Sequence, residues 1–406
     1  MLLTGGGRLA IALSDGATHP ATISPWAIEV VGDRIAWVGE RPRDAGGRSG
    51  NAGDVVDLGD ALVTPGLVDS HTHPVFAGDR SDEAAARLDG ATYDGGGILR
   101  TVTSTQAADE ATLERLVEER LLRALASGVT TIECKSGYGL TLDEELRHLR
   151  LLARVADRVP LRVVRTFLGA HGVPAGEDPT SHAARVADEM IPVVAADGLA
   201  AFVDVFCDRG FYSLDHTERI ANAATTHGLG VRLHADQLAL TGAAELGARL
   251  GAASVDHLEQ LDAAGVTALA ASTTVATLLP APAVVLRDRL PPARALLDAG
   301  ATVALATDAN AGTFGDFGAL PLVIGLGATL LRMRVAEALG AATAGGAAAL
   351  RLSDRGVVAP GMLADLVAWD AEHEGAFALH LGGVRALRRW VGGRELPSPR
   401  DGDRVA

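Results

Sequence analysis

Lysine and cysteine are scarce in this sequence of 406 residues. A single lysine, Lys135, stands beside 35 arginines, and the only cysteines are Cys134 and Cys207. Two cysteines are too few for a disulfide framework and are typical of a reducing compartment, so we expect a cytoplasmic protein. A chain that otherwise uses arginine keeps lysine at one position, and Lys135 therefore needs a specific explanation.

Positive charge and long apolar runs are limited as well. The 36 basic residues face 51 acidic ones, which gives a formal net charge of −15 and argues against nucleic acid or an anionic membrane as a partner. The longest uncharged stretch, residues 263–286, contains serine, threonine and proline, so no membrane span is predicted. Residues 1–15 lack the basic start and long apolar core of a secretory signal.

Short β-like runs alternate with helical patterns through the middle of the chain. One helical stripe, which ends before Gly128, consists of Leu113, Leu116, Val117, Leu121 and Leu125. Thr141 and Glu144 have the spacing of a capping box. Eight alternating strands suggest a (β/α)₈ barrel. The predicted barrel strands are residues 67–70, 129–135, 161–168, 202–206, 230–233, 253–255, 273–279 and 302–306.

Both ends of the chain have a β pattern that is distinct from the barrel region. Hydrophobic runs flank a Gly32-Asp33 turn near the start, and similar runs return near the end. We therefore predict an α/β protein in which residues 1–64 and 356–406 form a composite β-sandwich module and residues 65–355 form the barrel. The terminal strand signals are residues 26–31, 34–38, 55–63, 364–369 and 384–391.

Histidine and aspartate follow several of the predicted barrel strands. His71 and His73 come after the first strand, where the alternation of an extended chain points both rings to the same side. His234 follows the fifth strand, His257 the sixth and Asp308 the eighth. The carboxyl ends of barrel strands form the active-site mouth. The sequence therefore predicts a metal site at that mouth.

Four of these residues form a set of three nitrogens and one oxygen: His71, His73, His234 and Asp308. Such a set suits one divalent metal ion, Zn²⁺ or Fe²⁺, with Zn²⁺ favoured. The metal would lower the pKa of a bound water and supply hydroxide for hydrolysis at carbon. The fourth strand ends at residues 205–208 without a lysine that could bridge two metals. A non-catalytic metal-binding or ligand-binding barrel is an alternative, although the retained candidate bases argue against it.

The sequence around these positions resembles the amidohydrolase superfamily, above all in residues 65–73. Within the superfamily, further motifs are similar to those of the imidazolonepropionase family, the ring-opening hydrolases of histidine degradation. The resemblance covers nearly the whole chain, including residues 364–367. The motifs that carry it are residues 76–80 (FAGDR), 95–98 (GGGI), 135–140 (KSGYGL), 168–171 (LGAH) and 234–237 (HADQ).

This resemblance implies a substrate, a reaction and a set of site residues. Water adds to the ring amide carbonyl of 4-imidazolone-5-propanoate and gives N-formimidoyl-L-glutamate, and the enzyme is expected to be a homodimer. The same four metal ligands carry over by matching motif. The implied substrate-binding residues are Arg80 and Tyr138 at the carboxylate, His171 near the scissile carbonyl, Gln237 at the ring, and Asn310, Gly312 and Thr313 around the pocket.

The catalytic roles have two open assignments. Either His257 or Asp308 takes the proton from the attacking water, and either His257 or His171 stabilises the developing oxyanion. Gln237 cannot be the base, because an amide does not accept a proton at neutral pH, whereas a glutamate at that position could. We therefore look for the base in His257 and Asp308.

The closest rival is a related deaminase that acts on a ring or formimino substrate. It would share the metal set but would not need a carboxylate clamp. Arg80 offers a planar, permanently charged fork that suits a propanoate, and Tyr138 lies between two glycines in a loop that can approach a ligand closely. These two residues favour ring opening over deamination.

The sequence departs from the imidazolonepropionase pattern at three places. The loop at residues 93–95 is shortened, Ala311 stands where a proline is usual, and Gln106 stands where an arginine is usual. None of these changes removes a predicted ligand. For Lys135, at the end of the second predicted strand, we expect a structural role beside the pocket and not a metal-bridging one.

Overall fold

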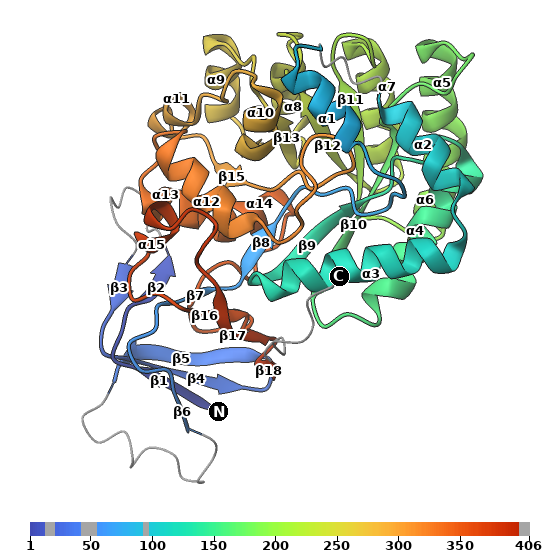
Figure 1. Ribbon diagram of the computed structural model, residues 1–406. Coiled ribbons are helices and arrows are strands. Elements are labelled where there is room, and N and C mark those ends of the chain that lie inside the picture. The colour runs from blue at the N-terminus through green and yellow to red at the C-terminus, as the bar shows by residue number, and fades with distance from the viewer. Residues whose placement is uncertain (13–20, 42–54, 92–96, 398–406) are drawn as a thin grey trace.

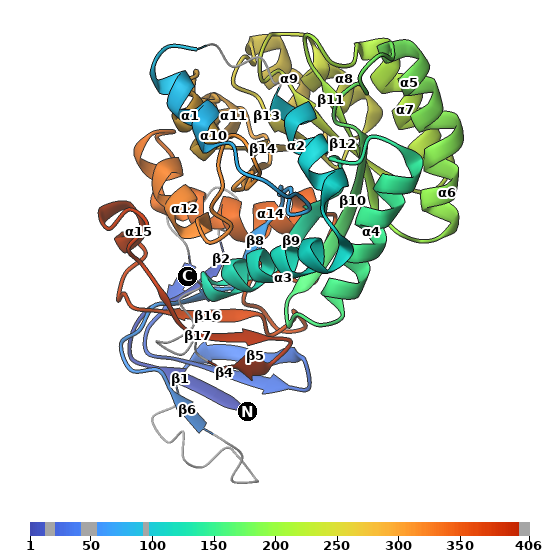
Figure 2. The same cartoon turned by 45° about the vertical axis from the view of Figure 1, so that its right-hand side comes forward.

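The computed structural model describes residues 1–12, 21–41, 55–91 and 97–397 (Figure 1). A barrel surrounded by helices makes up most of the molecule, and smaller sheets built from the two ends of the chain lie below it in both views (Figures 1 and 2). The shortened loop at residues 93–95 lies outside the described residues. The predicted fold class is confirmed.

The barrel is an eight-stranded parallel sheet whose strands pair in chain order. Most strand residues are buried, because helices cover the outer face and side chains fill the interior. All eight predicted strands are present. They are β8 (Leu67–Asp69), β9 (Val129–Lys135), β10 (Arg162–Ala170), β11 (Phe202–Cys207), β12 (Gly230–Ala235), β13 (Ser254–His257), β14 (Val275–Leu278) and β15 (Val303–Leu305).

The first and last strands of the barrel meet just beyond their carboxyl ends. The backbone N–H of Asp308 donates to the carbonyl of His71 over 3.0 Å. The buried Asp69 carboxylate accepts the backbone N–H of Thr307 at 3.1 Å and its hydroxyl at 2.7 Å. Burial raises the pKa of Asp69 to about 7, against the opposing effect of these hydrogen bonds. The ring is thus closed next to two predicted metal ligands.

Helices cover the outside of the barrel (Figure 2). In the longest described helix, residues 110–126, four residues of the predicted stripe are buried and the fifth, Leu116, is half-buried. Gly128 (φ +101°) allows the chain to turn into β9. No described helix is long and apolar enough to cross a membrane. The helices are α1 (Ser81–Leu88), α2 (Gly97–Ala107), α3 (Glu110–Ala126), α4 (Leu142–Ala156), α5 (Pro179–Arg185), α6 (Ile191–Ala196), α7 (Leu214–Thr226), α8 (Ala243–Leu250), α9 (Ala263–Ala270), α10 (Pro280–Leu286), α11 (Ala293–Asp298), α12 (Leu320–Thr329), α13 (Val335–Gly340), α14 (Gly346–Ala349) and α15 (Ala376–Leu379), with π-helical turns at Val186–Met190 and Ala341–Gly345.

The start of α4 corrects one prediction. The helix begins after Thr141 as expected, but the Thr141 side chain makes no capping hydrogen bond, so the capping box with Glu144 is wrong. Glu145, one residue further along, turns its buried carboxylate back to the amides of the preceding loop, residues 137–140. The acidic side chain at the start of α4 therefore binds the backbone amides of the tight loop and does not cap the helix.

The ends of the chain build two further sheets, with strand orders β5-β4-β1-β6 and β18-β17-β16-β7-β2-β3. Buried residues of both sheets, such as Trp26 and Trp390, share one hydrophobic core. The predicted strand at residues 55–63 is wrong as a single strand, because a turn at Gly59 (φ +58°) divides it between the sheets. The strands are β1 (Leu2–Gly5), β2 (Leu9–Ala12), β3 (Ala21–Ile23), β4 (Trp26–Val31), β5 (Arg34–Glu40), β6 (Val55–Asp57), β7 (Val63–Pro65), β16 (Leu366–Trp369), β17 (Ala386–Val391) and β18 (Arg394–Leu396).

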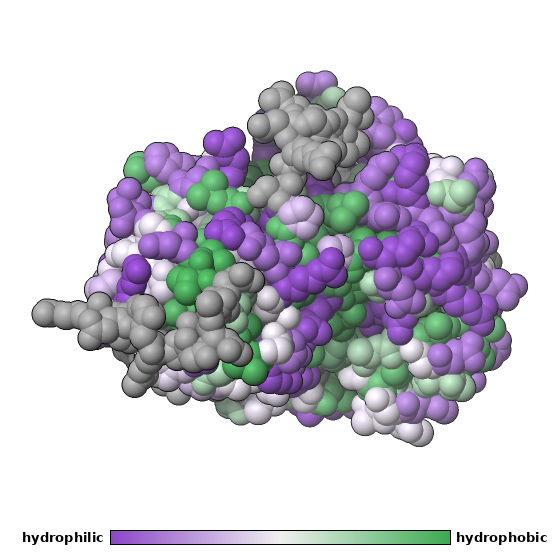
Figure 3. Space-filling view, turned by 90° about the horizontal axis from the view of Figure 1, so that it is seen from below, coloured by the Kyte–Doolittle hydropathy of each residue, from purple (hydrophilic) through white to green (hydrophobic). Residues whose placement is uncertain are grey.

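The second sheet joins strands from both ends of the chain, as the composite module requires. The domain bounds, residues 1–64 with 356–406 and residues 65–355, stay a prediction. Seen from below, this end of the molecule has both hydrophilic and hydrophobic residues on its surface (Figure 3). Scattered apolar residues of this kind are normal on a protein surface and need no partner to explain them.

One histidine in the helical layer makes stability depend on pH. His148 of α4 is fully buried, and neither ring nitrogen has a hydrogen-bond partner in the described part of the chain. Burial lowers its pKa to about 3, and the neighbouring Arg147 adds to the effect. His148 therefore stays neutral in the folded protein, whereas in the unfolded chain it takes up a proton as the pH falls below about 6.5.

We expect this difference to destabilise the folded protein in acid, because protons bind the unfolded state preferentially. Lowering the pH from 7 to 5 should remove about 2 kcal/mol of unfolding free energy through His148 alone. Urea denaturation of the His148→Leu variant should show an acid-induced loss smaller by that amount. The matched His227→Leu change removes an exposed histidine and should leave the loss as it is, and equal losses in both variants would contradict the assignment.

Candidate active site

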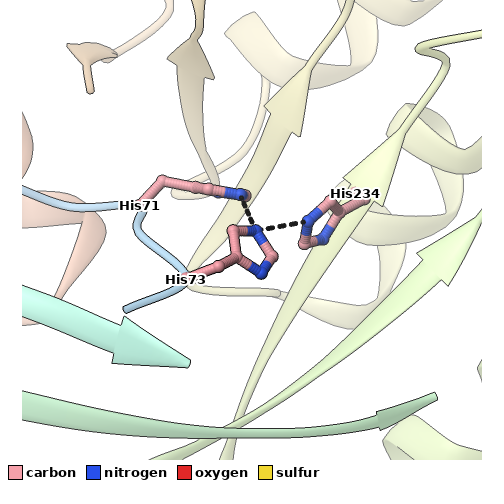
Figure 4. A group of neighbouring side chains, drawn as sticks. All are labelled: His71, His73 and His234. Carbon is pink, nitrogen blue, oxygen red and sulfur yellow. Dashed lines mark hydrogen bonds between the residues drawn. The ribbon is translucent and has the colours of Figure 1, made fainter. Parts of the chain in front are cut away.

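The four predicted metal ligands converge at the carboxyl ends of the barrel strands. Nε2 of His73 lies 3.2 Å from Nε2 of His71 and 3.4 Å from Nε2 of His234 (Figure 4). Asp308 Oδ1 lies 3.6 Å from Nε2 of His71 and 3.4 Å from Nε2 of His73. A tetrahedral zinc ion with bonds of 2.0–2.1 Å would hold its ligand atoms about 3.4 Å apart. The spacing therefore fits a single divalent ion.

One carboxylate oxygen of this centre also lacks a hydrogen-bond partner among the residues that the structure describes. Asp308 Oδ1 is buried and makes no hydrogen bond within the described residues, which is costly for a carboxylate unless a cation is bound there. A second metal-capable group reuses His71 and Asp308 with His257. A third combines His71 with Asp204 and Asp256, but protein cations already pair with those two carboxylates. One metal ion is therefore the arrangement that these residues fit.

Two buried aspartates orient the histidines. Asp256 Oδ2 lies 2.7 Å from Nδ1 of His71, and Asp204 Oδ1 lies 3.1 Å from Nδ1 of His234. These contacts place a proton on Nδ1 and leave Nε2 free for a metal. Burial, together with the nearby charge of Lys135, holds the pKa of His71 well below its usual range. The sequence analysis missed both aspartates, and their one signal is an acidic residue inside an apolar strand.

Lys135 forms ion pairs with two buried carboxylates next to these histidines. Its fully buried ammonium lies 2.8 Å from Glu133 Oε1 and 2.7 Å from Asp204 Oδ2. Glu133 Oε2 in turn accepts the backbone N–H of Thr72, the residue between the two histidines that follow β8, at 3.1 Å. One cation thus supports the carboxylate behind His234 and the backbone between His71 and His73, which agrees with the structural role expected for Lys135.

Arg232, which the sequence analysis did not single out, has the corresponding position behind His71. Its fully buried guanidinium donates to Asp256 Oδ2 at 3.0 Å and to the Ser70 carbonyl at 2.6 Å. A third hydrogen bond reaches the Ala349 carbonyl at 2.7 Å. An arginine within the apolar strand β12 was the available signal. The histidines on both sides of the centre are therefore held through buried ion pairs.

His257 lies between two carboxylates at the edge of the centre. Its Nε2 is 3.9 Å from Asp308 Oδ2, and its Nδ1 is 3.5 Å from Glu259 Oε1. Burial opposes a charge on His257, but the carboxylates of Glu259 and Asp308 outweigh it and raise the pKa to about 9. His257 (φ +85°) and Asp308 (φ +49°) both have left-handed backbone conformations, a strain that is common at functional sites. The sequence analysis missed Glu259.

One cavity collects almost all of the predicted site residues. Ile98 and Phe206, which the sequence analysis did not single out, give it an apolar wall, and His71 and Gly312 lie outside its lining. A small number of polar groups on an apolar pocket wall is typical of a small-molecule site. The lining residues are His73, Arg80, Ile98, Tyr138, His171, Phe206, His234, Gln237, His257, Asp308, Asn310 and Thr313.

Arg80 is held firmly at the rim of this cavity. Its Nε donates to Glu83 Oε2 at 2.9 Å, and its Nη2 forms an ion pair with the same oxygen at 2.8 Å, which leaves the second N–H of Nη2 unused within the described residues. A Cβ atom at Gly97 or Gly312 would collide with the guanidinium. Gly312 therefore acts by leaving room for Arg80, and the buried Nη2 retains a donor for an anionic ligand. Glu83 was missed in the sequence.

Tyr138 and His171 lie together beside the metal centre. The ring centroids of Tyr138 and His171 are 5.1 Å apart, and the ring of His171 stacks on His73 at 5.0 Å. Nδ1 of His171 donates to the Gly137 carbonyl at 2.9 Å. Burial holds the pKa of His171 well below its usual range. His171 is therefore neutral, with Nε2 left over for another partner.

Two of the remaining predicted residues hold loops that follow barrel strands, Asn310 through its side chain and Gln237 through its backbone. Asn310 accepts the backbone N–H of Gly312 at 2.7 Å and of Thr313 at 2.9 Å, and its amide group donates to the Asp308 carbonyl at 2.6 Å. Its side chain thus shapes the loop after β15. The backbone N–H of Gln237 donates to Asp208 Oδ2 at 2.8 Å, which fixes the loop after β12.

We predict that the metal affinity depends on Lys135. A Lys135→Met change leaves the buried carboxylates of Glu133 and Asp204 without their shared cation, and loss of such an outer contact typically weakens metal binding roughly 10- to 100-fold. Elemental analysis after equilibration with graded chelator should show this shift. Arg150→Met, which removes an exposed cation paired with Asp197, serves as the control, and equal chelator midpoints in the two variants would refute the role.

Comparison with known proteins agrees with this architecture. The Amidohydrolase family profile matches residues 79–395. Imidazolonepropionase from Caulobacter vibrioides (strain NA1000 / CB15N) is 44% identical over 384 residues, covering 92% of this chain and 94% of that protein. Imidazolonepropionase from Streptomyces avermitilis is 43% identical over 385 residues, covering 94% of this chain and 90% of that protein.

Solved structures show the same fold at low sequence identity. 5-Methylcytosine deaminase from Klebsiella pneumoniae aligns with a TM-score of 0.76 at 16% identity, covering 98% of both chains. Atrazine chlorohydrolase from Arthrobacter aurescens, complexed with zinc, aligns with a TM-score of 0.70 at 19% identity, covering 97% of this chain and 94% of that one. The chain therefore belongs to the amidohydrolase family and, within it, to the imidazolonepropionase family.

Proposed function

We propose that this protein hydrolyses 4-imidazolone-5-propanoate to N-formimidoyl-L-glutamate, a step of histidine degradation. The observation that carries this proposal is a single cavity that contains both a metal-binding set of histidine and aspartate and a buried arginine. The substrate has the two matching features, a cyclic amide and a carboxylate. Relatives named imidazolonepropionase, 43–47% identical over most of the chain, support the same reaction.

We propose Zn²⁺ as the resident ion in preference to Fe²⁺. Three imidazole nitrogens and one carboxylate oxygen suit zinc, and two structural neighbours are described with bound zinc. When bound, such an ion lowers the pKa of a water molecule and polarises a carbonyl oxygen. His71, His73, His234 and Asp308 would hold it.

The environments of His257 and Asp308 support one assignment of the base. His257 lies between the carboxylates of Glu259 and Asp308, which favour its protonated form, so it donates hydrogen bonds and stabilises the developing oxyanion. Asp308 Oδ2 then accepts the proton of the attacking water. As the new C–O bond forms and the ring C–N bond breaks, Asp308 passes that proton to the leaving ring nitrogen.

The carboxylate of the substrate belongs beside Arg80, which lines the same cavity. Arg80 offers its buried Nη2, while Glu83 fixes the orientation of the guanidinium. Tyr138 lines the same cavity and supplies a hydroxyl. Its ring lies 5.1 Å from that of neutral His171, which faces the scissile carbonyl in this arrangement. Gln237 contacts the ring. Asn310, Gly312 and Thr313 shape the loop that closes the pocket.

A deaminase acting on a ring or formimino substrate would use the same metal set. A neutral ring does not require a buried guanidinium, so Arg80 favours the propanoate. A non-catalytic binding barrel would not require Asp308 to lie beside a charged His257. We further propose a homodimer in the cytoplasm, on the basis of the family resemblance and of two free, buried cysteines, which are typical of a reducing compartment.

The direct test is an assay of the metal-loaded protein with 4-imidazolone-5-propanoate. We expect the ultraviolet absorbance of the substrate to fall as N-formimidoyl-L-glutamate forms, and we expect chelation to abolish the reaction because the ion supplies the reactive water. Elemental analysis of the same sample identifies the ion. Undiminished absorbance, or activity that survives complete metal removal, would exclude the proposed reaction.

The carboxylate clamp has its own kinetic signature. Arg80→Met removes a charge-assisted contact worth about 1.5–3 kcal/mol and should raise KM roughly 10- to 150-fold with a small change in kcat. Arg115→Met removes an exposed arginine paired with Glu119 and should have wild-type kinetics. A KM for Arg80→Met equal to that of the control would show that the substrate carboxylate lies elsewhere.

A further inference from the structure

The loop that carries Tyr138 is held by a buried carboxylate. Glu145, in the first turn of α4, is fully buried and accepts the backbone N–H groups of Gly139 and Leu140, both at 2.8 Å. The N–H of Gly137 lies 3.2 Å from Oε1 and 3.0 Å from Oε2 of the same carboxylate. Three amides on either side of Tyr138 therefore converge on one side chain.

The carbonyl groups of the same loop are held from the other side. The Gly137 carbonyl accepts Nδ1 of His171 at 2.9 Å, and the Gly139 carbonyl accepts Nε2 of Gln106 at 2.9 Å. The Leu140 carbonyl accepts Nε2 of His182 at 3.0 Å. Gln106, one of the departures noted in the sequence, thus has a specific structural contact. Side chains fix both the donors and the acceptors of the loop.

This arrangement also compensates for an unfavourable backbone. Gly137 has φ +107° and Leu140 has φ +59°, a left-handed conformation that a leucine rarely adopts. Such a conformation persists only where surrounding contacts determine it. The hydrogen bond from the Leu140 amide to Glu145 is one of these contacts. Without the carboxylate, we expect the loop to relax toward other conformations and to move Tyr138.

We propose that Glu145 is a positioning residue for the reaction. Its carboxylate sets the loop that presents Tyr138 to the substrate carboxylate, and the Gly137 carbonyl of that loop orients His171. Glu145 itself does not line the cavity. A carboxylate is needed because three N–H donors point to one group, whereas a glutamine would turn an NH₂ group toward at least one of them. The inference rests on the proposed function, since it assigns Tyr138 and His171 to the substrate.

The test uses Glu145→Gln in the full-length, metal-loaded protein. We expect KM for 4-imidazolone-5-propanoate to rise about tenfold, kcat to fall by less, and metal content to equal that of the wild type. Amide hydrogen exchange of residues 136–141 should become faster while the barrel strands keep their protection. The control Glu144→Gln changes the adjacent carboxylate, which pairs with Arg147, and should leave all four measurements unchanged.

A double-mutant cycle separates positioning from a general structural effect. Tyr138→Phe should raise KM in the wild-type background and add little in the Glu145→Gln background, because the loop no longer places the hydroxyl there. Fully multiplicative effects of the two changes on KM would overturn the proposal. If Glu145→Gln does not fold, Gln106→Met releases the Gly139 carbonyl instead and should raise KM about threefold with the same non-additivity toward Tyr138→Phe.

The outcomes distinguish this inference from the proposed function. A wild-type protein that does not consume 4-imidazolone-5-propanoate would refute the proposed function itself. An active wild type, combined with a Glu145→Gln variant of unchanged KM, would refute only the positioning role. Faster exchange in the loop without any change in KM would count against the proposal too, because it would show that Tyr138 does not depend on the loop.

Discussion

The pairing of buried charges behind the metal centre is the constraint on which the rest of the site depends. Charged groups in a protein interior are tolerated only with close partners. The charges of His257 and Glu259 cancel, and burial favours the neutral form of Asp69. Four further buried carboxylates surround the histidines, and two buried cations face them, which leaves two negative charges. A divalent ion supplies the missing charge. The carboxylates are Glu133, Asp204, Asp256 and Asp308, and the cations are Lys135 and Arg232.

This charge pairing also explains why the chain keeps a single lysine. The ammonium of Lys135 is compact and reaches two carboxylates at 2.7 and 2.8 Å in a fully buried space. Arg232 has a different task, because its planar fork spans one carboxylate and two backbone carbonyls. A point charge suits the first position and a rigid fork the second. The chain therefore has lysine, and not its usual arginine, at the one position where the geometry requires an ammonium.

The sequence predicted the parts of the structure that follow from periodicity and topology. Strand alternation placed His71 and His73 on one side, and barrel topology brought Asp308 to the same mouth. Contacts inside the barrel could not be predicted, because no local sequence pattern around a residue such as Asp204, within an apolar strand, indicates its partner. The capping box failed for a related reason: Thr141 matches a local rule, whereas the position of Glu145 is set by the loop before the helix.

The same reasoning resolves the conflict between an acidic protein and an anionic substrate. A net charge of −15 repels anions at long range, but charges on the surface are screened within about 10 Å at moderate ionic strength. Near the cavity, Glu83 lies 2.8 Å from Arg80, 3.9 Å from Arg87 and 3.4 Å from Arg100. Arg100 also pairs with Asp82 at 2.8 Å, so two carboxylates face three guanidinium groups, and Glu83 can orient Arg80 without neutralising it. The rim therefore stays locally positive, and a substrate carboxylate can complete the pairing of charges there.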